Sequence, residues 1–176
     1  VNEVERSFKL HCCSKLRDFV FKYEDLLGKE IWDVLDEEIQ QDPGAFLSAI
    51  NSYASRKGNL PIYLLIDEYD NFTNTILSTY GTEYYQKATH GEGFVRGFFN
   101  VIKAATTGTG SALQRMFITG VSPVTMDDVT SGFNIGTNIT TDPWFNDLVG
   151  FSEAELREML TYYKEQGVLM QTVDET

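Results

Sequence analysis

The sequence is poor in basic residues and in cysteine, and it has no long apolar run. Lysine and arginine number 14 against 26 acidic residues, which gives a net charge of −12 over 176 residues. A chain this acidic is a poor candidate for direct nucleic-acid binding, which needs a basic face, or for contact with an anionic membrane. No stretch approaches the roughly 20 apolar residues of a transmembrane helix. We also expect no signal peptide, because the first residues are charged and lack an apolar core.

The two cysteines, Cys12 and Cys13, are adjacent. Neighbours in sequence rarely pair with each other, so the sequence provides no disulfide framework. The ligand spacing of a zinc site is also missing. We therefore interpret both thiols as helix-packing residues. Reduced thiols are typical of a cytoplasmic protein.

A phosphate-binding loop of the form G-x-x-x-x-G-K-[ST] does not occur in the sequence. Two glycine-containing stretches, 91–97 (GEGFVRG) and 107–111 (TGTGS), lack its spacing and its Gly-Lys pair. The lysine contacts the phosphates and the following hydroxyl contacts Mg²⁺, so both are needed for the function of such a loop. Neither stretch is therefore expected to cradle a phosphate.

The most informative stretch is 60–70, LPIYLLIDEYD. Its apolar run at 62–66 predicts a strand buried on both faces of a parallel sheet. The run ends at Asp67 and Glu68, and open α/β sheets place their chemistry just past the carboxyl ends of the strands. A buried strand that ends in Asp-Glu is the Walker B pattern of P-loop ATPases, in which the Asp holds Mg²⁺ and the Glu positions the attacking water. The alternative interpretation is a core strand that leads into a solvated acidic turn.

Apolar residues at spacings of three and four predict helices over residues 1–27, 43–58, 72–80, 93–106 and 152–165. The segment 81–93 is expected to be a loop or a broken helix. Ser152 and Glu155 form a capping box that marks the start of the last helix. A second strand is predicted over 115–121 (RMFITGV), which ends in a polar cluster from Thr119 to Ser122, and a short strand is predicted near 138–140.

Three blocks then stand in order: LLIDEYDNF (64–72), FITGVSPVTMDDVTSGFN (117–134) and GFSEAELREML (150–160). Together they resemble the AAA-ATPase-like domain family, a group of P-loop ATPases found in many bacterial and archaeal proteins. The resemblance covers about residues 60 to 163. It implies an α/β fold with a parallel sheet in a three-layer P-loop sandwich, and Mg²⁺ and ATP as ligands. Family members often carry a C-terminal domain that resembles PD-(D/E)XK nucleases, so such a domain is a candidate partner in the parent protein.

Carried over by position, the resemblance makes Asp67 the magnesium ligand and Glu68 the catalytic glutamate. Thr119, or in second place Ser122, takes the position of the sensor residue that contacts the γ-phosphate or orients the water. For Thr119 the structural alternative is a hydroxyl that satisfies backbone groups at a strand end. Tyr69 and Asp70 match the DEYD pattern of the family, but the pattern assigns them no role.

The family's P-loop lies upstream of this region, and the sequence opens on Val1 within an apparent helix. We therefore expect an N-terminally truncated fragment of a longer protein. In sheets of this family the sensor strand lies between the Walker B strand and the P-loop strand, so both strands would lack a neighbour here. Unpaired edges are costly and promote association. We expect this chain alone to bind ATP poorly and to unfold or self-associate, which makes a homo-oligomer a candidate assembly.

Three functions remain open. The first is the Walker B and sensor portion of a protein that binds and hydrolyses ATP. The second is a non-catalytic interaction or regulatory module with an ATPase-like fold, which the missing P-loop favours. The third is a metal-dependent hydrolase built on Asp67, Glu68 and Asp70 that cleaves phosphodiesters without ATP. A nuclease of that kind would also need a nearby lysine and a basic groove, and neither is evident in the sequence.

Overall fold

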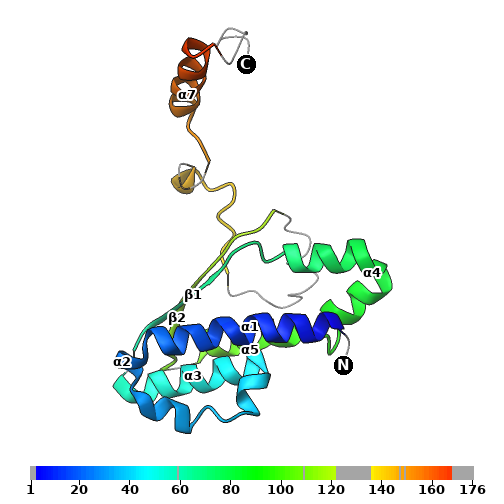
Figure 1. The fold of residues 1–176 in the computed structure, drawn as a ribbon, viewed down its shortest axis with the longest axis vertical. Coiled ribbons are helices and arrows are strands. Elements are labelled where there is room, and N and C mark those ends of the chain that lie inside the picture. Colours follow the sequence, from blue (N-terminus) through cyan, green and yellow to red (C-terminus); the bar gives the residue numbers. More distant parts are fainter. Residues whose placement is uncertain are drawn as a thin grey trace. The chain divides into compact units, whose positions relative to one another are not determined.

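The computed structural model describes residues 3–58, 60–108, 110–121, 136–146, 148 and 150–167. The chain divides into two compact units, Val1–Gly136 and Thr137–Thr176. The first unit holds most of the helices and the sheet, and the second holds a short 3₁₀ turn and one helix (Figure 1). Among the helices of the described ranges, none combines the length and the apolar character needed to cross a membrane.

The first unit begins with helices and 3₁₀ turns, in the order α1 (Glu3–Lys22), α2 (Glu24–Leu27), η1 (Lys29–Asp33), η2 (Ile39–Gln41) and α3 (Pro43–Gly58). The helix predicted over residues 1–27 is divided between α1 and α2, and Gly28 follows α2 with a φ of 85°, which favours glycine. At the start of α3 the carboxylate of Asp42 accepts a hydrogen bond from the Ala45 amide at 2.8 Å. Pro43 needs no amide partner in this first turn, so the two residues together begin the helix.

The remaining elements of the first unit are β1 (Ile62–Ile66), α4 (Asn71–Thr89), α5 (Phe94–Thr107) and β2 (Leu113–Ile118). The bounds of β1 and α5 agree with the predictions. Helix α4 continues well beyond the predicted 72–80, but it is interrupted at Gly81, where φ is 79° and ψ is 177°. The expected broken helix is therefore confirmed, and the break lies at the residue type that best tolerates this backbone conformation.

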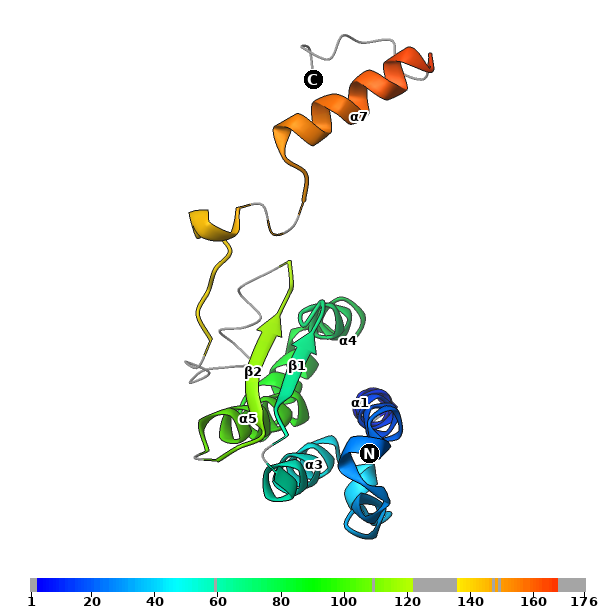
Figure 2. The ribbon, with the colours of Figure 1, turned by 90° about the vertical axis from the view of Figure 1, so that its left-hand side faces the viewer.

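Strands β1 and β2 pair in parallel and lie side by side (Figure 2), with Leu64 opposite Met116 and Ile66 opposite Ile118. Strand β2 starts and ends earlier than the predicted 115–121. It starts earlier because pairing begins where the Ile62 amide donates to the carbonyl of Ala112 at 2.7 Å. It ends at Ile118 because the next residue, Thr119, turns toward the loop after β1. There its carbonyl accepts a hydrogen bond from the Tyr69 amide at 3.0 Å.

One face of the sheet packs against the helices and the other is exposed. On the inner face, Leu64, Ile66, Met116 and Ile118 contact a buried cluster that α4 and α5 dominate. On the outer face, Tyr63 is 61% and Leu65 75% exposed. The prediction of a strand buried on both faces is therefore wrong for the described residues, because successive side chains alternate between faces and the described helices cover one of them. The unit is a helix-rich α/β arrangement with a two-stranded parallel sheet.

A second buried cluster joins α1 to α3. Its fully enclosed members include Val20 from α1, Ile31 from η1, and Phe46 and Ile50 from α3. Cys13 belongs to the same cluster, which agrees with its interpretation as a packing residue. This cluster fixes α1 against the rest of the unit, and α1 in turn forms one wall of the cavity described in the next subsection.

In the second unit, η3 (Pro143–Phe145) is followed by α7 (Glu153–Glu165). The predicted capping box is confirmed: the Glu155 amide donates to Oγ of Ser152 at 3.3 Å, and the Ser152 amide donates to Oε2 of Glu155 at 2.9 Å. The short strand predicted near 138–140 is wrong, because these residues form an irregular segment and a turn. No residue of α7 is buried.

Candidate functional site

The candidate site lies at the carboxyl end of β1, where the strand passes into α4 through residues 67–70. Asp67 and Glu68 are exposed, whereas Asp70 is buried. The strand ends here because its last ladder bond joins Ile66 to Thr119, after which the backbone turns at Glu68. Two carboxylates are therefore available to a ligand, and a third is held inside the protein.

Thr119 comes from the end of β2 and meets the two exposed acidic residues. Its hydroxyl donates a hydrogen bond to Oδ1 of Asp67, and it accepts one from the Glu68 amide at 3.3 Å. Its backbone is bonded on both sides, since its amide donates to Ile66 at 2.9 Å and its carbonyl accepts from Tyr69 at 3.0 Å. The hydroxyl therefore satisfies a backbone group and also contacts a carboxylate at the strand ends.

The backbone of Glu68 adopts a φ of 50°, and within the described part of the chain this is the only non-glycine residue with a positive φ. Such conformations are uncommon for residues with a side chain, and they concentrate at functional sites. Asn71, the first residue of α4, donates from its side-chain amide to Oε2 of Glu68 at 3.1 Å, and its backbone amide donates to the Glu68 carbonyl at 2.9 Å. The side chain of Asn71 therefore holds the Glu68 carboxylate in place.

A cavity of about 660 Å³ opens beside this turn. The turn contributes Asp67, Glu68 and Asn71 to the cavity wall, and α1 contributes polar side chains that include His11 and Lys15. Cys12 also lines the cavity. Burial, together with the neighbouring Cys13 thiol, raises the pKa of Cys12 to about 12, so this thiol stays protonated at neutral pH.

The exposed carboxylates suit a magnesium ion that arrives with a nucleotide. Within the described ranges, no three side chains of His, Cys, Asp or Glu come together as a metal site. Mg²⁺ is commonly held by one or two carboxylates, with water and substrate phosphates as its other ligands. Asp67 has a second carboxylate oxygen that Thr119 does not contact, so the residues present fit this mode of binding.

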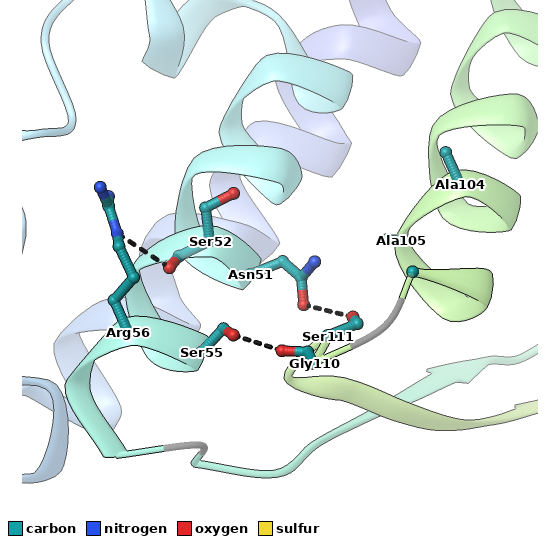
Figure 3. A pocket seen from close by; sticks show the side chains of 9 residues that line it. Asn51, Ser52, Ser55, Arg56, Ala104, Ala105, Gly110 and Ser111 are labelled. Carbon is teal, nitrogen blue, oxygen red and sulfur yellow. Dashed lines mark hydrogen bonds between the residues drawn. The ribbon is translucent and has the colours of Figure 1, made fainter.

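Two further stretches stood out in the sequence, one with a second sensor candidate and one that was rejected as a phosphate-binding loop. Ser122 lies outside the described residues. Gly108, Gly110 and Ser111, from the second glycine-containing stretch, line a separate cavity of about 600 Å³ near the start of β2. There the Asn51 side chain accepts a hydrogen bond from the Ser111 hydroxyl at 3.0 Å (Figure 3). It accepts another from the Leu113 amide at 2.8 Å. These contacts attach the loop to α3 and set the start of β2, which is a structural role.

Sequence reasoning gave Asp70 a role only as a carboxylate of the metal-dependent hydrolase, and it did not select Asn71 or Gly120. All three depend on how the turn folds. Asn71 bonds to Glu68, whose φ is positive, and Asp70 bonds to the amide of Val121, which lies 51 residues away and just beyond β2. Gly120 directly follows Thr119, the predicted sensor residue. This position is the one sequence signal that could have drawn attention to the contact of Asp70 with Val121.

Comparison with known proteins agrees with the resemblance drawn from the three sequence blocks. A family model described as predicted AAA-ATPase matches residues 1–130, which include the whole described turn and Thr119. The third block, at 150–160, lies beyond the matched residues. No curated protein and no solved structure matches this chain significantly.

Proposed function

The chain belongs to the AAA-ATPase-like family of predicted AAA-ATPases, and on that premise we propose that its first unit forms the Walker B and sensor portion of a site that binds and hydrolyses MgATP. The observation that carries the proposal is the link between Thr119 and Asp67. It joins a hydroxyl and a carboxylate at the carboxyl ends of two adjacent parallel strands. Nucleotide sites of open α/β sheets are built at this edge.

Each residue has a distinct role in the proposed site. Asp67 holds the magnesium ion, directly or through water, with the carboxylate oxygen that Thr119 leaves free. Glu68 accepts a hydrogen bond from the attacking water and polarises it, while Asn71 keeps its carboxylate in place. Thr119 acts as the sensor, and Ser122 is the second candidate for that role. Mg²⁺ bound with the nucleotide would supply neutralisation of the phosphate charge.

The proposal requires a phosphate-binding loop from a polypeptide segment other than these 176 residues, because the motif does not occur in them. In the proposed three-layer sandwich, a P-loop strand would lie beside β2, and a further strand would lie beside β1. Both strands of the described sheet have one edge that no other described strand pairs with. The outer face that exposes Tyr63 and Leu65 would be covered in the same assembly.

A second candidate function is a non-catalytic interaction or regulatory module. The lack of a phosphate-binding motif in these 176 residues favours it. The paired carboxylates argue for the first function, because a module that never binds nucleotide has no need of two exposed acidic side chains held by Thr119 and Asn71.

The deciding experiment measures MgATP binding and hydrolysis by the natural protein that contains this chain, with Glu68→Gln beside it. We expect wild type to hydrolyse ATP and Glu68→Gln to bind ATP without turnover, because the amide cannot accept the proton of the water. Glu92→Gln is the matched control, since Glu92 is exposed and lies outside the site. If neither wild type nor Glu68→Gln binds ATP, the interaction module replaces the ATPase.

A further inference from the structure

We propose that Asp70 is a positioning residue that fixes the end of β2 and so sets the place of Thr119 between Asp67 and Glu68. The catalytic part of this inference rests on the proposed ATPase function. The anchoring part is a property of the fold and can be tested without nucleotide.

Asp70 is an acidic side chain with only 2% of its surface exposed. Both of its carboxylate oxygens accept from the Val121 amide at 3.2 Å, and Oδ2 also accepts from the side chain of Asn74 at 3.3 Å. Its backbone carbonyl accepts from the Thr73 hydroxyl at 2.9 Å in the first turn of α4. The residue therefore joins the start of α4 to the chain that leaves β2.

Gly120 lets the two segments approach closely enough for these bonds. A Cβ added at Gly120 would lie 2.2 Å and 2.4 Å from ring atoms of Tyr69, and 2.8 Å from Oδ1 of Asp70. Real Cβ atoms do not come this close, so a side chain here would push the end of β2 away from the turn. The turn at residues 67–70 therefore packs closely against the residues that follow Thr119.

Thr119 lies between two sets of anchors. On one side the sheet ladder holds it through Ile66, and on the other side Asp70 holds Val121, two residues further along. Its hydroxyl must reach Asp67 and the Glu68 amide at the same time. A displacement of about 1 Å in a reacting constellation can lower a rate by roughly a hundredfold, so loss of the second anchor acts on chemistry through Thr119.

The test compares Asp70→Ala, Asp70→Asn and Gly120→Ala in the natural protein that contains this chain. Asp70→Ala removes both acceptors, Asp70→Asn keeps one oxygen that can accept from Val121, and Gly120→Ala disturbs the same contact from the other strand. Thr89→Val is the control. It alters a buried hydroxyl at the far end of α4 that bonds to Tyr85 and does not contact β2. Amide hydrogen exchange at Val121 and the kcat and KM for MgATP are measured for each.

We expect exchange at Val121 to accelerate at least about tenfold in Asp70→Ala and Gly120→Ala, because local protection follows local bonding. We expect kcat to fall at least about tenfold with KM within about twofold of wild type, since positioning for the chemical step is lost while nucleotide contacts remain. Asp70→Asn should accelerate exchange at Val121 and lower kcat less than Asp70→Ala does. Thr89→Val should leave Val121 protected even where it lowers the melting temperature.

A double-mutant cycle separates positioning from general destabilisation. If Asp70 acts through Thr119, adding Asp70→Asn to Thr119→Val should lower kcat no further than Thr119→Val alone. Independent, multiplying losses would overturn the positioning role. Unchanged exchange at Val121 in all Asp70 and Gly120 variants would overturn the anchoring itself. A wild-type protein without ATP turnover would instead overturn the proposed function and with it the catalytic part, while Val121 exchange still decides the anchoring.

Discussion

The hydroxyl of Thr119 donates a hydrogen bond to Oδ1 of Asp67, and the two residues come from the ends of adjacent parallel strands. Replacing the threonine with valine removes the hydroxyl and keeps the shape. We expect Thr119→Val to lower kcat for MgATP by about 10- to 100-fold, the usual effect of losing one hydrogen bond to a charged group. Steady-state kinetics on the natural protein measures it.

Thr119→Ser is the matched control for this prediction, because serine keeps the hydroxyl and loses one methyl group. It should retain most of the wild-type kcat. Equal activity of the valine and serine variants would mean that the hydroxyl only satisfies the Glu68 amide, which is the structural alternative for this residue.

Asn71 offers a second prediction, because its side chain holds Oε2 of Glu68 at 3.1 Å. Asn71→Ala should lower kcat severalfold, since the Glu68 carboxylate would then sample more rotamers and orient the water less often. The free energy of unfolding should change little, because this hydrogen bond is exposed. Thr75→Ala is a suitable control: its hydroxyl bonds to the Asn71 carbonyl at 2.9 Å and does not contact Glu68. A kcat for Asn71→Ala equal to that of this control would rule out the orienting role.

The elements that sequence predicted best are those with a local signal. The bounds of β1 follow from a short apolar run between Pro61 and Asp67, and the start of α7 follows from Ser152 and Glu155. The start of β2 was misplaced because it depends on a bond between Ile62 and Ala112, which are 50 residues apart along the chain. The exposed face of β1 was also missed, since an unbroken apolar run says nothing about which neighbours the described fold supplies.

In the candidate site, too, some features could be predicted from the sequence and others could not. The family resemblance implied a common site for Asp67, Glu68 and Thr119, and the Thr119 hydroxyl bonds to the Asp67 carboxylate and to the Glu68 amide. The hydrogen-bond partners of Asp70 and Asn71 could not be foreseen, because they depend on a φ of 50° at Glu68 and on a close approach at Gly120. Neither property leaves a trace in hydrophobic periodicity.

The thiol of Cys12 provides a prediction about reactivity. Burial raises its pKa to about 12, so very little thiolate is present at pH 8. Iodoacetamide should therefore modify Cys12 in the folded protein far more slowly than in denaturant at the same pH, and the rate should keep rising as the pH increases above 9. Mass spectrometry of the modified peptide follows the reaction, with a Cys13→Ser variant to isolate Cys12. Rapid modification at pH 8 would contradict the raised pKa of this thiol.

The last prediction concerns the start of α7. Hydrogen bonds from the Ser152 hydroxyl and the Ser152 amide lower the pKa of the Glu155 carboxyl below its ordinary value of 4.5. A carboxyl whose pKa is lowered by folding stabilises the folded form above its unfolded pKa, and this stabilisation is lost as the pH falls through the lowered value. The helix content of a peptide covering residues 150–167 should therefore decrease between about pH 5 and pH 3.

Ser152→Ala should lower the stability of this helix by about 1 kcal/mol at neutral pH, the typical cost of removing a serine N-cap. Glu155→Gln keeps the reciprocal bond to the Ser152 amide but cannot ionise, so its helix content should lose this pH dependence while retaining most of the helix. Circular dichroism of the three peptides, with carboxyl titration by NMR, measures both effects. Equal pH profiles for the wild-type and Glu155→Gln peptides would contradict a stabilising role for the ionised Glu155 carboxylate.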